Sequence, residues 1–193
     1  MSSMEIEVKF PVDDLAGLAQ RLLNAGFHLE TPRTFERNVL YDTPDRRLRA
    51  QQAILRVRNY GGQWKITHKC LPRDHDPSAR HKHREETETS VHDGEAIGHI
   101  FAQLGYVPSF AYEKWRTEYA DATGHCVLDE TPIGVYAELE GPEDWIDATG
   151  RALGIDPAQF STLSYGRLFD QWRQRTGSSV ENLTFNEIPT RAL

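Results

Sequence analysis

Glu5-Ile6-Glu7-Val8-Lys9-Phe10, near the start of the chain, alternates charged and apolar residues without a break. Because successive side chains of a β-strand point to opposite faces, this period of two predicts a strand with one charged and one apolar face. The charged face carries both signs, since Glu5, Glu7 and Lys9 all lie on it. A half-buried strand usually has scattered polar residues on its outer face, so this density of charge needs an explanation.

Further strands and several helices follow along the chain. Strands are predicted over residues 37–41, 53–59, 63–69, 84–91, 112–119, 126–129 and 135–139, with turn residues such as Gly61-Gly62 between them. Amphipathic helices are predicted after a cap at Asp13 and over residues 93–104, 143–153 and 165–175, where apolar residues recur at three- and four-residue spacing. The fold class predicted is α+β.

Charged faces recur on most of the predicted strands. The sets that share a face are Arg56 and Arg58; Lys65, Thr67 and Lys69; Arg84, Glu86 and Glu88; Lys114, Arg116 and Glu118; and Glu138 and Glu140. Charges of both signs on a common face fit a closed antiparallel barrel with a polar lumen, whose apolar exterior is covered by the amphipathic helices. The same pattern fits an open sheet whose charged face meets water. The pattern alone does not separate these two architectures.

A charged lumen limits what the protein can bind. Burying an unpaired ion costs several kcal/mol, so a ligand has to compensate the lumen charges. Lys and Arg bind phosphate oxygens, and clustered carboxylates are the hard oxygen ligands that Mg²⁺ or Mn²⁺ prefers. Two E-x-E pairs, Glu5 with Glu7 and Glu138 with Glu140, suit one or two metal ions. We therefore predict a cavity for a metal-bound polyphosphate.

Six short motifs occur in one order along residues 4–170. They are Glu5-x-Glu7-x-Lys9, Tyr41-Asp42-Thr43-Pro44, Leu55-Arg56-Val57-Arg58, Arg84-x-Glu86-x-Glu88, Lys114-x-Arg116 and Glu138-x-Glu140. In this order they resemble the CYTH, or triphosphate tunnel metalloenzyme, superfamily, which includes class IV adenylate cyclases, thiamine triphosphatases and inorganic triphosphatases. The resemblance implies an eight-stranded antiparallel barrel and so favours the closed tunnel. One departure follows Lys69, where Cys70-Leu71-Pro72 stands in place of the family's frequent Gly-Pro.

The resemblance also implies roles for the charged residues. The first metal ion would be held by Glu5, Glu7 and Glu140. A second metal ion, or the catalytic water that it activates, would be served by Glu88, Asp129 and Glu138, with Glu86 as the alternative to Glu88. The phosphate-binding residues would be Lys9, Arg37, Arg56, Arg58, Lys65, Lys69, Arg84, Lys114 and Arg116.

The expected function is a divalent-metal-dependent hydrolase of inorganic, thiamine or nucleoside triphosphate, in which water attacks the terminal phosphorus. The same residues would serve an adenylate cyclase that makes cyclic AMP and pyrophosphate from ATP. A third alternative is a noncatalytic polyphosphate-binding module, which the full set of metal carboxylates disfavours. The cofactor expected is Mg²⁺ or Mn²⁺, the partner is a small-molecule triphosphate, and the chain is expected to be a monomer or a homodimer.

Composition sets the outer limits on function. The 193 residues include 29 acidic and 22 basic side chains, for a formal charge of −7, and 38% are hydrophobic. This acidic balance argues against nucleic acid or an anionic membrane as a partner. With no apolar stretch of membrane-span length, a cytoplasmic protein with free thiols at Cys70 and Cys126 is expected. The domain is expected over residues 1–176, with residues 177–193 as a loosely held tail.

Several other residues are given no catalytic role. His81 and His83, with His75 nearby, invite a zinc site, but they belong to a polar stretch without a matching carboxylate or cysteine cluster. They are therefore expected to be solvated loop histidines rather than zinc ligands. Trp64 and Trp115 lie on apolar strand faces and are expected to pack against covering helices. Tyr165 is expected to pack near the tunnel end.

The chain also contains a weak internal repeat. A shift of 79 positions (86 − 7) places Glu7 on Glu86, and the same shift places Arg37 on Arg116. Apolar helix positions correspond under this shift as well. It predicts two similar strand-helix-strand units related by a pseudo-twofold axis.

Overall fold

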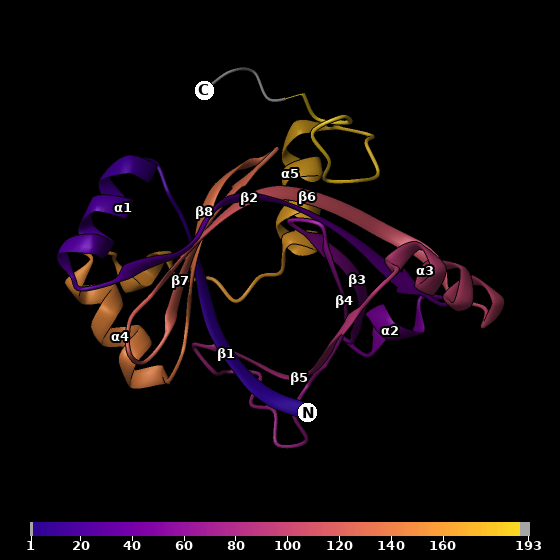
Figure 1. Cartoon of the computed structure of the whole chain (residues 1–193), viewed down its shortest axis with the longest axis horizontal. Coiled ribbons are helices and arrows are strands. Elements are labelled where there is room, and N and C mark those ends of the chain that lie inside the picture. Colours follow the sequence, from indigo (N-terminus) through magenta and orange to yellow (C-terminus); the bar gives the residue numbers. More distant parts are fainter. Residues whose placement is uncertain (1, 190–193) are drawn as a thin grey trace.

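The strands close into a barrel, as the resemblance implied. The computed structural model describes residues 2–189, and in them eight antiparallel strands pair in the closed order β1-β5-β4-β3-β2-β6-β7-β8 (Figure 1). The strands are β1 (Ser2–Pro11), β2 (His28–Asp42), β3 (Ile54–Tyr60), β4 (Gln63–Cys70), β5 (Lys82–Val91), β6 (Val107–Ala120), β7 (His125–Thr131) and β8 (Gly134–Glu140). In the same residues we find no helix with the length and apolarity needed to cross a membrane.

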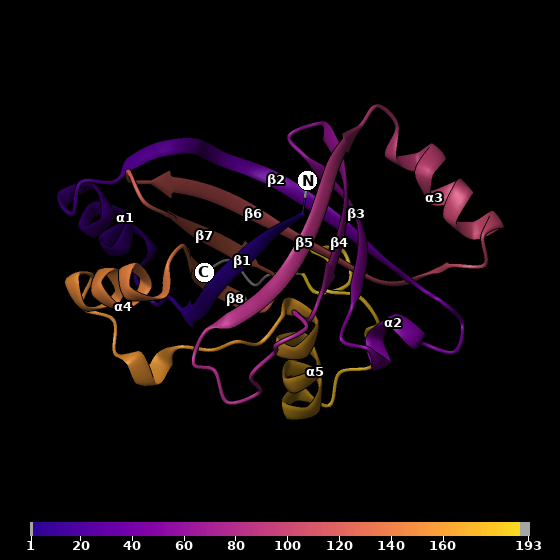
Figure 2. The same ribbon diagram turned by 90° about the horizontal axis from the view of Figure 1, so that it is seen from below.

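The helices lie outside the barrel. They are α1 (Leu15–Asn24), α2 (Arg47–Ala50), α3 (Gly94–Gln103), α4 (Glu143–Ala152), the 3₁₀ turn η1 (Pro157–Gln159) and α5 (Tyr165–Thr176). Helices α1 and α4 flank one side, α2 and α3 flank the opposite side, and α5 stands apart from both groups (Figures 1 and 2). The cap of α1 is Asp14 rather than the expected Asp13, because the Asp14 carboxylate accepts the Gly17 N–H at 2.8 Å.

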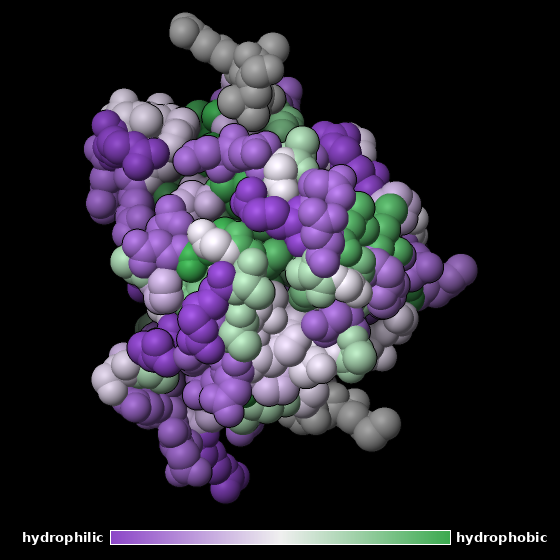
Figure 3. Space-filling view, turned by 90° about the vertical axis from the view of Figure 1, so that its left-hand side faces the viewer, coloured by the Kyte–Doolittle hydropathy of each residue, from purple (hydrophilic) through white to green (hydrophobic). Residues whose placement is uncertain are grey.

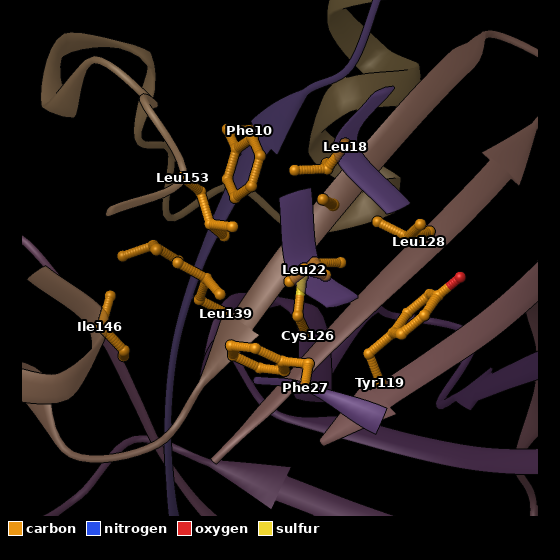
Figure 4. Packing of buried hydrophobic residues seen from close by; sticks show 12 residues of the cluster. Phe10, Leu18, Leu22, Phe27, Tyr119, Cys126, Leu128, Leu139, Ile146 and Leu153 are labelled. Carbon is orange, nitrogen blue, oxygen red and sulfur yellow. The ribbon is translucent and has the colours of Figure 1, made fainter. Parts of the chain in front are cut away.

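The main apolar core lies between the outer face of the barrel and the helices α1 and α4. Strand residues such as Phe10 and Leu139 meet Leu18 and Leu22 of α1 and Ile146 of α4, and all of them are buried (Figure 4). The face over α1 and α4 carries many hydrophilic residues on the outside, with apolar patches between them (Figure 3). The amphipathic helices therefore cover the apolar exterior, as expected from their spacing, and leave the charged strand faces to the lumen.

A second apolar cluster joins α5 to the barrel. Tyr165 and Phe169 of α5 pack with Tyr112 of β6, and Leu183 and Ile188 complete this cluster. Leu183 is fully buried, and its backbone N–H donates to the Ala111 carbonyl at 3.0 Å. The expected loosely held tail is thus wrong for residues 177–189, because a short segment without helical or strand periodicity can still be anchored by one buried leucine. Residues 190–193 lie outside the described part of the chain.

Two strands are much longer than predicted. β2 and β6 pair with each other along most of their lengths and extend well beyond residues 37–41 and 112–119. The N-terminal part of β2 is exposed on both faces, so it shows no alternation that a sequence pattern would detect. β5 also begins earlier than expected and includes Lys82 and His83, which the sequence had placed at the edge of a loop.

Strand pairing has the symmetry that the internal repeat requires. Exchanging β1–β4 with β5–β8 leaves the strand order unchanged. Glu5 pairs directly with Arg84, its counterpart 79 positions along the chain (84 − 5). The pseudo-twofold axis thus passes through the β1–β5 and β2–β6 pairs.

We predict that Gly150→Ala destabilises the protein. A Cβ at Gly150 would lie 2.6 Å from the Phe160 ring, and Phe160 packs on the main core, so the ring must shift. We expect overpacking to lower the unfolding free energy by about 1–3 kcal/mol in urea denaturation. The matched control is Gly166→Ala in α5, where the nearest atom is 3.7 Å away and the change should be within about 1 kcal/mol. Equal stability of both variants would contradict the prediction.

Candidate active site

A cavity of about 1430 Å³ occupies the barrel lumen. Most of the charged residues predicted from the sequence line it. Those whose side chains point inward come from six strands. They are Glu5, Glu7, Lys9, Arg56, Arg58, Lys69, Arg84, Glu86, Glu88, Lys114, Arg116, Glu138 and Glu140. Arg37 of β2 also belongs to the lining, although its side chain is 60% exposed. The structure thus brings together side chains spread over more than a hundred positions of sequence.

Carboxylates gather where β1 meets β8. Glu7 pairs in register with Glu140, and Glu5 is the next inward residue of β1. Burial pushes the pKa of Glu7 upward, but the ammonium groups of Lys82, Lys9 and Lys69 outweigh it and lower that pKa to about 2. Glu140 lacks comparable compensation, because burial first, and then Glu5 and Glu7, raise its pKa to about 7.

This acidic cluster fits a divalent cation. Burial, followed by the neighbouring Glu7, raises the pKa of Glu5, and its Oε2 is buried without a hydrogen-bond partner. An orphaned carboxylate oxygen and a crowd of carboxylates both gain from an added positive charge, and carboxylate oxygens suit Mg²⁺ or Mn²⁺. Among residues 2–189 no three His, Cys, Asp or Glu side chains already surround a common point, since lysines are bound to Glu5 and Glu7.

Lys114 and Arg116 form the centre of a basic wall on β6. Arg116 donates to both oxygens of Asp129, at 2.7 and 2.6 Å, and to Glu138 at 2.9 Å. Lys114 donates to Asp129 at 2.9 Å. Burial lowers the pKa of each of these two cations, but the carboxylates outweigh that effect and hold both pKa values above their usual range. Both side chains are therefore charged and fixed in position.

Glu36 of β2 is an inward-facing carboxylate, buried behind the cavity lining, that the sequence prediction missed. Its side chain is fully buried, with Lys114 at 3.5 Å, Arg58 at 3.8 Å and Arg116 at 4.0 Å. Burial opposes its ionisation, but these cations hold the pKa of Glu36 far below the usual range. What identifies Glu36 as inward-facing is its pairing with Lys114 across β2 and β6. A single sequence does not reveal this pairing.

A second group of cations lies on β3 and β4. Arg58 donates to Glu88 at 3.2 Å, and Lys65 donates to the same carboxylate at 2.6 Å. Arg56 donates to the Tyr112 hydroxyl at 3.2 Å and to Thr67 at 3.1 Å. Lys65 is not part of the cavity lining, but it binds the carboxylate of Glu88, which is.

Lys82 of β5 is a second residue that the sequence prediction missed. It is buried against Glu7, and although burial lowers its pKa, Glu7 and Glu5 raise that pKa above the usual range. Every second residue from Lys82 to Glu88 is charged, so Lys82 shares one face of β5 with Arg84, Glu86 and Glu88. Extending the predicted strand by two residues would have placed it in the lumen.

Arg37 borders the cavity from an exposed position and is not one of its buried cations, so its phosphate-binding role stays a prediction. Its neighbours Glu36 and Asn38 are fully buried and face inward, so Arg37 faces outward and its side chain is 60% exposed. Its nearest ionic partner is Glu113, at 4.0 Å on the outer face of β6. In this part of β2, apolar residues occur on both faces of the strand, so the sequence alone did not show which face points into the barrel.

The structure also separates the predicted metal and catalytic carboxylates. Asp129 is fully buried behind the basic wall, and its oxygens accept bonds from Lys114, Arg116 and the Tyr165 hydroxyl, the last at 2.7 Å. It does not line the cavity, so its contacts show a residue that positions cations rather than the expected metal ligand. Glu138 lines the cavity, but one of its oxygens is bound to Lys9 and the other to Arg116.

Tyr165 and Trp64 lie as expected, and Trp115 does not. Tyr165 is buried and lines the cavity, where Lys9 and Lys114 lie 4.3 and 4.7 Å from its ring centre. Trp64 packs so closely on α3 that Gly94 is required beside it. Trp115 instead packs against Phe35 of the neighbouring strand, with the Arg33 guanidinium 4.1 Å from its ring centre.

Comparison with known proteins agrees with this geometry. The CYTH domain family model matches residues 3–143, so the chain belongs to the CYTH domain family. A Methanocaldococcus jannaschii protein provisionally named an adenylate cyclase is 28% identical over 138 residues, which cover 71% of this chain and 76% of that protein.

Two solved structures share the fold. An X-ray structure from Vibrio parahaemolyticus, also provisionally named an adenylate cyclase, is 18% identical with a TM-score of 0.74 and covers 88% of this chain and 99% of its own. A Hippeastrum protein provisionally named an adenylyl cyclase and described as having a dominant triphosphatase activity is 20% identical with a TM-score of 0.61. That match covers 93% of this chain and 98% of the Hippeastrum chain.

We predict that Asp129→Asn strongly destabilises the protein. The substitution keeps the side-chain shape but leaves the buried Lys114 and Arg116 short of negative charge, which should cost about 3–5 kcal/mol of unfolding free energy. The control is Glu130→Gln on the same strand, which weakens an exposed pair with Arg33 and should cost less than about 1 kcal/mol. A loss for Asp129→Asn no larger than that of the control would refute the positioning role.

Proposed function

We propose that this protein is a divalent-metal-dependent hydrolase of a small triphosphate. The observation that carries the proposal is the separation of charge within one cavity. Carboxylates with raised pKa values, Glu5 and Glu140, lie on β1 and β8. The arginines of β3 lie opposite β8 in the barrel order. A triphosphate bound between these walls would meet metal ligands on one side and guanidinium groups on the other.

The fixed cations suit the chemistry of phosphoryl transfer. Arg56, Arg58, Lys114 and Arg116 are held by buried partners, so they do not have to reorganise as charge develops on the phosphoryl oxygens. The oxygen of water attacks the terminal phosphorus, the bond to the bridging oxygen breaks, and phosphate and the shortened phosphate chain leave. Mg²⁺ or Mn²⁺ on Glu5, Glu7 and Glu140 would neutralise phosphate charge and acidify a bound water.

An adenylate cyclase is the second candidate, because the Methanocaldococcus jannaschii relative carries that name. The triphosphatase activity described for the Hippeastrum neighbour supports the hydrolase. Both reactions use the same cations and carboxylates. They differ in the phosphorus attacked, so the products distinguish them.

A product assay tests the proposed function. Inorganic triphosphate, thiamine triphosphate and ATP are each incubated with the full chain and Mg²⁺, Mn²⁺ or EDTA, and phosphate, pyrophosphate and cyclic AMP are measured. We expect phosphate release that requires the metal ion. Cyclic AMP with pyrophosphate as the main products would replace the hydrolase with the cyclase. Tight triphosphate binding without turnover would support the noncatalytic module instead.

We predict that two arginine-to-alanine substitutions differ strongly in their effect on kcat/KM. Arg58→Ala should lower kcat/KM for the preferred triphosphate by about 100-fold or more, because it removes a preorganised guanidinium from the cavity. Arg37→Ala removes the same charge from an exposed position at the border of the cavity and should lower kcat/KM far less than Arg58→Ala does. Steady-state kinetics of the two variants, with circular dichroism to check folding, measure the difference. A larger loss in Arg37→Ala than in Arg58→Ala would reverse the assignment of the lumen face.

A further inference from the structure

Two histidines, His81 and His83, lie at the border of the cavity where β5 begins. His83 pairs with Ile6, which packs on the outer core, whereas Lys82 and Arg84 on either side of it face the lumen. Both histidines nevertheless contribute to the cavity lining. His81 directly precedes the strand, has the same parity as His83 and is 95% buried, with 5% of its surface exposed. Neither residue takes part in the proposed phosphoryl transfer. Both differ from the solvated loop histidines that the sequence suggested.

Helix α4 supplies two carboxylates to these histidines. The Oε1 atom of Glu143 is 2.8 Å from His83 Nε2, and its Oε2 atom is 3.8 Å from His81 Nδ1. One helical turn later, Asp147 Oδ1 is 3.1 Å from His81 Nε2. The carboxylates are more than sixty positions away in sequence from His81, which explains why the sequence showed no cluster.

One ring nitrogen of each histidine in this cluster makes no hydrogen bond. His83 Nε2 is buried and makes no hydrogen bond, although the Glu143 carboxylate is beside it. Since a carboxylate only accepts hydrogen bonds, the contact with Asp147 places the proton of neutral His81 on Nε2 and leaves Nδ1 with a free lone pair. That lone pair and the unpaired His83 nitrogen therefore lie on either side of the Glu143 carboxylate.

We propose that His81 Nδ1, His83 Nε2 and the Glu143 carboxylate form a zinc-binding site, with Asp147 as the outer partner of His81. Two imidazoles and one carboxylate are a common zinc ligand set, and a water would take the fourth position. Asp147 is itself held by Arg80 at 2.8 Å, as expected for a carboxylate that orients a metal-bound histidine. The proposal does not depend on the proposed function of the lumen.

The distances suit a site that closes on its ion. Neighbouring ligand atoms around tetrahedral zinc lie about 3.3 Å apart, because Zn–N and Zn–O bonds are about 2.0–2.1 Å long. The 2.8 and 3.8 Å separations about Glu143 lie on either side of this value. In the described part of the chain no such group yet converges on one point. The Glu143 side chain is 50% exposed, so it is free to rotate onto an ion while His81 stays fixed.

Zinc at this site would connect two parts of the molecule that touch the tunnel. The segment between β4 and β5 contributes His75, Asp76 and His81 to the cavity lining, and α4 belongs to the helices over the main core. A bond from His81 and His83 to Glu143 would fix the end of this segment to α4. The ion would therefore stabilise the lining at this border of the cavity.

Metal titration of the full chain tests the proposal. After removal of metal with a chelator, the chain is titrated with Co²⁺, a spectroscopic substitute for Zn²⁺, in excess Mg²⁺ to occupy the lumen carboxylates. We expect one Co²⁺ equivalent with a visible absorption band, and X-ray absorption of the Zn²⁺ form should show two imidazole ligands. His83→Gln and Glu143→Gln should each abolish this band. Asp147→Asn should weaken Co²⁺ binding by about 10–100-fold.

A lumen variant separates this site from the tunnel. Glu7→Gln should keep the Co²⁺ band, because Glu7 is bound to Lys82 and is not a member of the His81–His83–Glu143 cluster. Retention of the band in Glu143→Gln, loss of it in Glu7→Gln, or a zinc shell of oxygen ligands alone would each overturn the proposal. Because Glu143 is half exposed, Glu143→Gln tests the site without a risk of unfolding, and circular dichroism verifies that all variants are folded.

Discussion

The structure depends on the compensation of charge inside a closed barrel. Ionised side chains from six strands face one lumen, and a buried ion without a partner would cost several kcal/mol. The central device is the pair of β6 cations with Asp129, whose carboxylate receives Arg116, Lys114 and the Tyr165 hydroxyl together. Tyr165 links this network to α5, so this helix and the basic wall are fixed by the same contact. The apolar cores outside the barrel stabilise the shell, and the lumen network sets the position of its charges.

Much of the fold followed from the alternation of residues along the strands. The period of two placed Glu5, Glu7 and Lys9 on one face and Val8 and Phe10 on the other, and the structure has both faces as predicted. Closure of the barrel did not follow from alternation, because an open sheet with its charged face exposed to water has the same sequence pattern. The order of the motifs supplied it through the resemblance. The tail after residue 176 was misjudged because its attachment rests on one buried side chain, Leu183, and a few backbone bonds rather than on a periodic pattern.

The site was less predictable than the fold. The sequence did not show which face of a strand points inward, or how neighbouring strands pair. Arg37 and Glu36 are adjacent, and only the pairing of Glu36 with Lys114 shows which of them faces the lumen. Lys82 was lost when the strand was started two residues late. His81 and Glu143 illustrate a different limit, since a cluster made by β5 and α4 has no local signature. Residue type indicated the chemistry of the lumen, whereas three-dimensional pairing decided which residues belong to it.

The lumen carboxylates differ in what the cations around them leave free. Glu138 and Asp129 each accept charged donors on both oxygens, so they serve to hold Lys9, Lys114 and Arg116 in place. Glu5 and Glu140 are short of positive charge: burial raises both pKa values, and so do neighbouring carboxylates, Glu7 for Glu5 and Glu5 with Glu7 for Glu140. A divalent cation would relieve this excess of negative charge at the β1–β8 contact and nowhere near Asp129. The sequence assigned all of these carboxylates to metal ions, whereas the charge balance of the folded chain favours such a role only for those at the β1–β8 contact.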